Sequence, residues 1–282
     1  MEDGLLNRKV VFIIQARMKS TRLPGKIIMP LPLGSGKPLL TWIIDELKKS
    51  KYFNKIVLAT SVNPENDLLI PFCENHEISY FRGDENNVLS RFTTIVRMNQ
   101  DYDCVVRLTA DNPIIDVSIL DKTIEEHFKN NNDYTRTDGL PVGLNFEIVS
   151  TSALLETEEN VLTDADKEHV TLYVRNNERF KKSVFDTNCN PKFKELRLTV
   201  DYASDYALVS TILSQSEVAN SKFGIQLVED VFNKYPWIFE TNSSNIQKKQ
   251  FIDCNEEIKE ACAFLKSYDF NHAATTLEMH VK

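Results

Sequence analysis

A cluster of cations follows the first apolar run of the chain. Residues 15–26 contain four cationic side chains and two hydroxyls, at Arg17, Lys19, Ser20, Thr21, Arg22 and Lys26. Guanidinium groups donate forked hydrogen bonds that suit phosphate oxygens, and lysine adds a point charge. A loop after a strand also exposes backbone N–H groups that can bind anions. The segment therefore fits a triphosphate, although a solvated basic loop has the same composition and the spacing is not that of a Walker A motif.

Two aspartates each follow a short apolar run. Asp111 comes after residues 104–108, and Asp201 comes after residues 196–200. Because ligands bind at the carboxyl ends of parallel strands, these carboxylates could converge on one metal ion. Mg²⁺ prefers a few carboxylates together with substrate phosphates. The alternative role for each aspartate is to cap the turn or helix that follows it.

A third candidate pair is Glu168 and His169. Adjacent residues on a helix point about 100° apart, so the two do not form a zinc H-E-x-x-H motif. A single histidine is more often structural than catalytic, and both roles stay open. The five histidines and five cysteines show no spacing typical of a zinc site. We expect the cysteines to be reduced thiols, because their number is odd and no C-x-x-C pair is present.

The elements that must position these residues alternate in type. Apolar periodicity predicts strands at residues 9–14, 55–60, 79–82 and 104–108. It predicts helices at residues 38–50, 66–76, 88–98 and 119–128. This alternation is typical of an α/β fold with a doubly wound, mostly parallel sheet.

The pattern becomes less regular after residue 130. It predicts strands at residues 145–149 and 196–200, and helices at residues 167–176, 206–217 and 226–234. A last helical region is expected at residues 255–282.

Charge and hydropathy exclude several classes of protein. Among 282 residues, 33 Lys and Arg stand against 41 Asp and Glu, which gives a net charge of −8. Binding to nucleic acid or to an anionic membrane needs clustered positive charge, so we expect neither partner. The apolar run at residues 10–14 is far too short to cross a bilayer, and the N-terminus does not resemble a signal peptide. We therefore expect a cytoplasmic protein.

Taken in order, these segments resemble the cytidylyltransferase family of sugar-acid activation. The most similar branch is that of spore-coat polysaccharide biosynthesis, which is related to the acylneuraminate and 3-deoxy-manno-octulosonate cytidylyltransferases. The resemblance runs from about Val10 to Pro236. It rests mainly on IQARMKSTRLPGK at 14–26, VRLTAD at 106–111, EHVT at 168–171 and LTVD at 198–201.

The resemblance implies a nucleotide-diphosphosugar-transferase-like fold and a homodimer. It also implies Mg²⁺-dependent transfer of CMP from CTP to a small-molecule acceptor, with release of pyrophosphate. The residues implied to bind the nucleotide are Gln15, Ala16, Arg17, Ser20, Arg22, Lys26, Arg82 and Thr109. The residues implied to act in catalysis are Arg17, Lys26, Asp111 and Asp201, with Asp111 and Asp201 as metal ligands. The residues implied on the acceptor side are Asn145, Glu147, Glu168 and His169.

The same resemblance divides the chain. A nucleotidyltransferase domain is expected over residues 1–236, and a helical C-terminal extension over residues 237–282. Within the domain, about 1–130 is the nucleotide-binding half, about 131–195 is an irregular acceptor and dimerisation region, and about 196–236 holds the metal-binding strand and helices.

Two departures from the family pattern leave alternatives open. Lys19 stands where the family usually has glycine, and Asn145 stands where it usually has aspartate. One alternative is a transferase of the same fold that uses GTP or UTP, or a phosphorylated acceptor. Another is a nucleotide-binding or assembly protein without activity. A glycosyltransferase is less expected, because no D-x-D motif follows a predicted strand.

Overall fold

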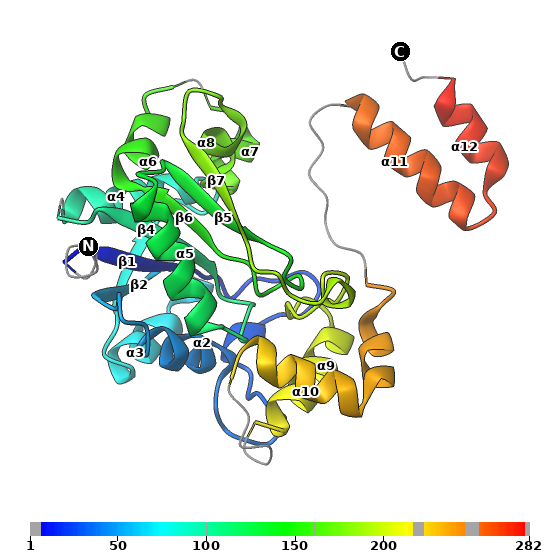
Figure 1. Cartoon of the computed structure of the whole chain (residues 1–282), viewed down its shortest axis with the longest axis horizontal. Helices are drawn as coiled ribbons and strands as arrows, with labels where there is room; N and C mark the ends of the chain where they lie inside the picture. The colour runs from blue at the N-terminus through cyan, green and yellow to red at the C-terminus, as the bar shows by residue number, and fades with distance from the viewer. Residues whose placement is uncertain (1–6, 100, 161, 217–222, 246–253, 280–282) are drawn as a thin grey trace. The chain divides into compact units, whose positions relative to one another are not determined.

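The computed structural model describes residues 7–99, 101–160, 162–216, 223–245 and 254–279. The chain divides into two compact units, Met1–Ser244 and Asn245–Lys282. The first unit holds a seven-stranded sheet with the order β3-β2-β1-β4-β6-β5-β7 (Figure 1). Its strands are β1 Val10–Gln15, β2 Lys55–Ser61, β3 Ser79–Gly83, β4 Cys104–Thr109, β5 Tyr134–Asp138, β6 Glu147–Ser150 and β7 Lys182–Asp186.

One strand of the sheet is reversed. The pairs β1–β2, β1–β4, β2–β3 and β5–β7 are parallel, and β6 runs antiparallel to both β4 and β5. The prediction of a mostly parallel α/β sheet is therefore confirmed. Gln15 pairs with Ala59 on one side and with Thr109 on the other, so β1, β2 and β4 end at the same edge of the sheet.

Helices cover both faces of the sheet because β1 is apolar on both faces. Alternate residues of a strand point to opposite sides. Val10, Phe12 and Ile14 pack in a cluster with α2 (Leu39–Leu47) and α5 (Val117–Lys129). Val11 and Ile13 pack in a second cluster with α4 (Val88–Met98) and α6 (Thr151–Thr157). The remaining helices of this unit are α3 Leu69–Asn75, α7 Asp164–Glu168, α8 Leu172–Asn176, α9 Ala203–Ser214 and α10 Ile225–Lys234, with short 3₁₀ helices η1 Lys26–Ile28, η2 Pro64–Asn66, η3 Pro191–Phe193 and η4 Pro236–Asn242.

Two predicted elements are wrong, and both lie in the less regular half. The helix predicted at residues 167–176 is two short helices, α7 and α8, because the backbone turns at Val170, which has a φ of 35°. The strand predicted at residues 196–200 is an extended segment with one isolated bridge, between Val142 and Arg197. Leu198 and Val200 are fully buried, so the apolar run reflected burial and not strand pairing.

Two strands of this half had no counterpart in the prediction. β5 has the sequence YTRTD and β7 has the sequence KSVFD, and neither carries the continuous apolar run that marks a buried strand. β7 is also the last strand of the sheet, where one edge has no neighbour in the described residues.

The first unit continues past Pro236, where the sequence suggested a boundary. Ile238 and Phe239 of η4 are buried in the first core cluster, which keeps this segment in the unit up to Ser244. In the second unit, α11 (Cys254–Ser267) and α12 (Asn271–Glu278) contact each other, with Cys262 and Ala274 buried. The predicted helical region is thus confirmed as two helices, and residues 280–282 lie outside the described residues. In the described ranges, none of the helices has both the length and the apolar content that crossing a bilayer requires.

A buried histidine under the sheet makes stability depend on pH. His127 of α5 is 2% exposed, and its Nδ1 lies 3.1 Å from the Thr135 hydroxyl. Burial lowers the pKa of His127 from 6.5 to about 4. The unfolded chain therefore binds a proton between these pH values that the folded chain does not, so stability falls as the pH falls from 6.5 towards 4.

We expect the free energy of unfolding to drop by about 2 kcal/mol from this group between pH 7 and pH 5. Urea unfolding at the two pH values measures it. In the variant His127→Gln, which cannot take up the proton, this part of the drop should vanish. Equal losses in the variant and the wild type would contradict the assignment.

Candidate active site

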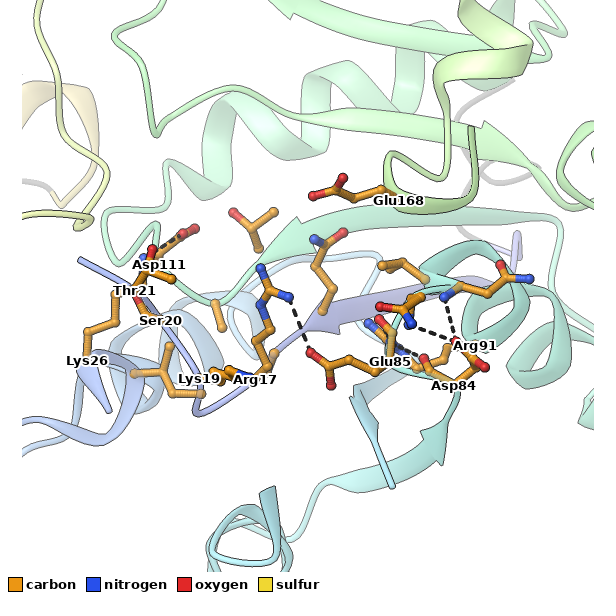
Figure 2. Close-up of a pocket in the computed structure, with 18 of the residues that line it drawn as sticks. Arg17, Lys19, Ser20, Thr21, Lys26, Asp84, Glu85, Arg91, Asp111 and Glu168 are labelled. Carbon is orange, nitrogen blue, oxygen red and sulfur yellow. Dashed lines mark hydrogen bonds and ion pairs between the residues drawn. The ribbon is translucent and has the colours of Figure 1, made fainter. Parts of the chain in front are cut away.

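A cavity of about 930 Å³ lies at the carboxyl ends of β1 and β4 (Figure 2). In Figure 2, Lys26 and Asp111 lie at one end, Asp84 and Arg91 lie at the other, and Arg17 lies between them. Of the residues singled out in the sequence, those that line it are Gln15, Ala16, Arg17, Lys19, Ser20, Thr21, Arg22, Lys26, Thr109, Asp111, Glu168 and Asp201. Those that do not are Arg82, Asn145, Glu147 and His169.

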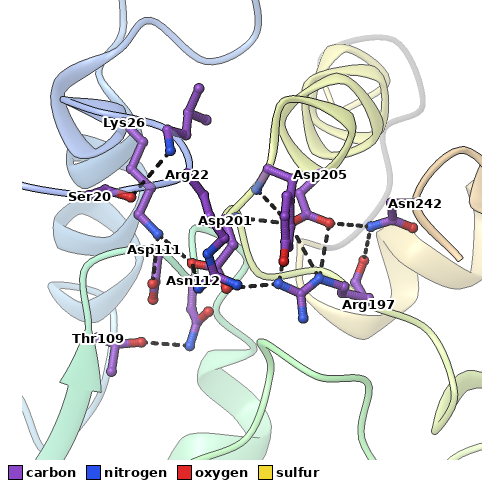
Figure 3. Close-up of polar contacts among 12 residues, drawn as sticks. Ser20, Arg22, Lys26, Thr109, Asp111, Asn112, Arg197, Asp201, Asp205 and Asn242 are labelled. Atoms are coloured by element: carbon purple, nitrogen blue, oxygen red, sulfur yellow. Dashed lines mark hydrogen bonds and ion pairs between the residues drawn. The ribbon is translucent and has the colours of Figure 1, made fainter. Parts of the chain in front are cut away.

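One lysine joins the two aspartates. Lys26 Nζ donates to Asp111 Oδ2 at 2.9 Å and to Asp201 Oδ1 at 2.8 Å (Figure 3). Its side chain is only 9% exposed. Arg22 adds an ion pair to the same oxygen of Asp201 at 3.1 Å. The structure therefore places Asp111 and Asp201 at the same cationic group, and metal binding by the pair stays a prediction.

The loop that carries these cations is tied down at both ends. Gly25, with a φ of 71°, donates its N–H to the Met18 carbonyl at 3.1 Å and starts η1, which carries Lys26. A left-handed residue at this point favours glycine. Met18 N–H in turn donates to Asn66 Oδ1 at 2.8 Å, and Asn66 is fully buried. Lys19 is not among the described residues with a positive φ, so lysine in place of the family's glycine causes no left-handed strain.

The charges around Asp201 determine its protonation. Burial alone would raise the pKa of this carboxyl group, but the hydrogen bond from Lys26 and the charges of Lys26 and Arg22 outweigh burial. The pKa of Asp201 is therefore below its ordinary value. Asp201 is thus a carboxylate at neutral pH, ready to act as an oxygen ligand.

The two aspartates fit a magnesium ion. Their carboxylates come from different segments, meet at one cationic group and have side chains that are 26% and 12% exposed. Within the described ranges, no group of three or more His, Cys, Asp or Glu side chains could hold a metal. Two carboxylates leave the other coordination positions to phosphate oxygens and water, which is the typical environment of protein-bound Mg²⁺.

The other end of the cavity is a loop before α4 that the sequence analysis did not single out. Asp84 Oδ1 accepts the N–H groups of Asn86 and Asn87 at 2.7 and 2.8 Å. Arg91 is 4% exposed and donates to the carbonyls of Asp84 and Glu85. Asn87 caps α4 by accepting from the N–H of Ser90 at 3.0 Å, and an Asn just before an apolar periodic segment is the signal that could have located this loop.

Two of the predicted nucleotide ligands take part in other contacts. Glu85 Oε1 pairs with Arg17 Nη1 at 3.2 Å, which fixes the arginine along the cavity. Arg82 pairs with Asp67 at 2.7 Å and donates to the Ser61 carbonyl at 3.2 Å. Nucleotide binding by Arg17 and Arg82 stays a prediction.

Glu147 does not line the cavity and is connected to a residue that does, Gln15, through Arg107. It pairs with Arg107 and accepts from the Thr171 hydroxyl at 3.1 Å. Arg107 Nε donates to Gln15 Oε1 at 3.2 Å, and Gln15 does line the cavity. Burial would raise the pKa of Glu147, but the charge of Arg107 and the hydrogen bonds of Tyr134 and Arg107 lower it, so the ion pair persists at neutral pH.

Of the other acceptor-side predictions, only Glu168 lines the cavity. It projects from α7 on the wall opposite Arg17 (Figure 2). His169 follows α7, and its Nε2 lies 3.9 Å from Glu168 Oε2. Asn145 Nδ2 donates to the Pro141 carbonyl at 3.1 Å and so holds the loop before β6. Acceptor binding by these residues stays a prediction.

Comparison with known proteins gives consistent matches over most of the chain. A family model described as cytidylyltransferase matches residues 11–260. The spore coat polysaccharide biosynthesis protein SpsF of Bacillus subtilis is 35% identical over 214 residues, which cover 73% of this chain and 87% of SpsF. A 3-deoxy-manno-octulosonate cytidylyltransferase of Leptospira biflexa is 26% identical over 136 residues, which cover 48% of this chain and 53% of that protein. The solved structure of a cytidylyltransferase from Leptospira borgpetersenii has a TM-score of 0.74 and 29% identity, and the match covers 86% of this chain and 100% of that chain.

The position of Lys26 leads to a stability prediction. Lys26→Met leaves two neighbouring carboxylates without their shared cation, so we expect the free energy of unfolding to fall by roughly 2–4 kcal/mol. Because a divalent cation can replace the missing charge, Mg²⁺ should restore more stability to this variant than to the wild type. Thermal unfolding at increasing Mg²⁺ concentration measures both effects.

The matched control is Lys19→Met, which removes an exposed lysine of the same loop and should change stability by less than about 0.5 kcal/mol. If both variants were equally stable, the ammonium of Lys26 would not be what holds the aspartates together.

Proposed function

The chain belongs to the cytidylyltransferase family, as its sequence predicted, and on this premise we propose that it transfers CMP from CTP to a sugar acid and releases pyrophosphate. The observation that carries the proposal is the meeting of Lys26, Asp111 and Asp201 at one end of a cavity lined by Arg17 and Arg22. The triphosphate needs such a set of cations, and a magnesium ion needs the two carboxylates.

The residues of the cavity act by position and charge. Arg17, Arg22 and Lys26 hold the triphosphate and neutralise the charge that develops on the departing pyrophosphate. A hydroxyl oxygen of the acceptor attacks the α-phosphorus and loses its proton to water, and the bond from that phosphorus to the bridging oxygen of pyrophosphate breaks. Asp111 and Asp201 would hold Mg²⁺, and the bound ion would supply Lewis-acid polarisation of the phosphoryl oxygens. No covalent intermediate with the protein is needed, because alignment of the two substrates lowers the barrier.

The acceptor class comes from two relatives and from the far wall of the cavity. One relative is named for spore coat polysaccharide biosynthesis and the other for 3-deoxy-manno-octulosonate, a sugar acid. Glu168 on α7 supports the assignment of this wall to the acceptor, with His169 beside it. Glu147 contacts Thr171, which follows this wall, and pairs with Arg107, which donates to the Gln15 amide. Asn145 holds the loop before β6.

We also propose a homodimer that acts in the cytoplasm. The family resemblance supports the dimer, and the five cysteines without a disulfide among the described residues support a reducing compartment.

The direct test is pyrophosphate release in the presence of Mg²⁺. CTP, GTP, UTP and ATP are each combined with a panel of sugar acids and of small phosphorylated acceptors. We expect release with CTP and a sugar acid. Release with another triphosphate alone would contradict the cytosine assignment, and failure of Mg²⁺ and CTP to bind by calorimetry would contradict the whole proposal.

Asp111→Asn tests the chemical step. The variant keeps the shape of the side chain but loses the charge that a magnesium ion needs, so kcat should fall by about 10²-fold or more. Asp230→Asn, on the exposed face of α10, removes the same charge far from the cavity and should leave kcat unchanged. Full activity of Asp111→Asn would rule out a metal ligand at this position.

A further inference from the structure

The two oxygens of Asp201 have separate partners. Oδ1 receives Lys26 Nζ at 2.8 Å and pairs with Arg22 Nη2 at 3.1 Å, both of which line the cavity. Oδ2 accepts from Arg197 Nη2 at 2.8 Å (Figure 3). Arg197 therefore holds the oxygen that does not contact Lys26 and Arg22.

Arg197 is itself fixed from behind by Asp205. Its Nε donates to Asp205 Oδ1 and Oδ2 at 3.1 and 3.3 Å, and Nη2 donates to Oδ2 at 3.3 Å. The side chain of Arg197 is 7% exposed and that of Asp205 is 0% exposed. Asp205 Oδ2 also accepts the backbone N–H groups of Asp201 and Tyr202, each at 2.9 Å. The planar guanidinium and the backbone of Asp201 are thus set by the same buried carboxylate.

Asn242 completes this network from a distant segment. Its Nδ2 donates to Asp205 Oδ1 at 2.8 Å and to the Arg197 carbonyl at 2.9 Å. The residue is 2% exposed and ends η4, close to the end of the first compact unit. Arg197, Asp205 and Asn242 are not among the described residues that line the cavity, so they act on a bound ligand through neighbours such as Asp201, which does line it.

Stability alone is a weak reason to bury this set of charges. Well-packed apolar residues in place of a buried ion pair are often neutral or stabilising, because desolvation of the charges is costly. Such charges can instead contribute to metal binding. Removal of groups that orient a metal-binding carboxylate typically weakens metal affinity by about 10- to 100-fold.

We propose that Arg197, Asp205 and Asn242 are positioning residues that turn Oδ1 of Asp201 towards the magnesium ion of the nucleotide complex. This inference rests on the proposed function. Asn242 is its most distinctive member, because it lies over forty residues from Asp201 in sequence and outside the segments that carry the family resemblance.

The test measures CTP binding to the full chain by calorimetry over a series of Mg²⁺ concentrations, and again in EDTA. In Asn242→Ala, we expect the Mg²⁺ concentration for half-maximal CTP binding to rise by about 10-fold. The affinity for CTP in EDTA, which depends on the cationic side chains of residues 15–26, should change by less than about twofold. Ser243→Ala truncates the exposed neighbour of Asn242 and should behave as the wild type.

Arg197→Lys provides a second variant, which keeps the buried positive charge and loses the planar guanidinium with its paired hydrogen-bond donors. It should shift the Mg²⁺ requirement at least as far as Asn242→Ala does, with the same small effect in EDTA. An unshifted Mg²⁺ requirement in either folded variant would overturn the inference, as would equal losses of CTP affinity with Mg²⁺ and with EDTA. If the wild-type protein bound CTP without any dependence on Mg²⁺, both the inference and the proposed metal role would be overturned. If the wild type depended on Mg²⁺ and the variants had the same Mg²⁺ requirement, the inference alone would be overturned.

Discussion

The ammonium group of Lys26 between the carboxylates of Asp111 and Asp201 is the interaction on which the site depends. Two carboxylates that both lie within hydrogen-bond distance of one ammonium group would repel each other if that cation were absent. The three residues come from distant parts of the sequence, so a separate local feature must position each of them. Gly25 turns the loop that carries Lys26, β4 ends just before Asp111, and Asp205 holds the backbone of Asp201.

The reversed strand β6 joins this site to the second half of the sheet. Glu147 at its start pairs with Arg107 of β4, and Arg107 holds the Gln15 amide at the end of β1. Because Gln15 Oε1 accepts from Arg107, this hydrogen bond orients the amide of Gln15. The orientation of a polar group that lines the cavity therefore depends on a strand, β6, whose residues are not among those that line it.

The sequence predicted the first half of the fold well because β1, β2 and β4 contain apolar runs that are buried on both faces. It also predicted that Asp111 and Asp201 meet, although the strand assumed before Asp201 is wrong. In addition to Lys26, a backbone hydrogen bond from Val200 N–H to the Asp111 carbonyl at 2.9 Å joins the two segments. The strands β5 and β7 are too polar for periodicity to detect. The contact between Arg197 and Asn242 could not be predicted either, since the two residues are 45 positions apart and no local sequence pattern relates them.

The chain order of the site also bears on how the protein is made. The strands that carry the cation loop and Asp111 are complete by Thr109 and pair with one another without later residues. Asp201 and the residues that orient it span Arg197 to Asn242, almost at the end of the first compact unit. Domains generally fold as units while the N-terminal part leaves the ribosome first. A chain that ends before residue 242 therefore carries Arg22 and Lys26 without the last residue of the network behind Asp201, so the orientation of this carboxylate is complete only when almost the whole first compact unit is present.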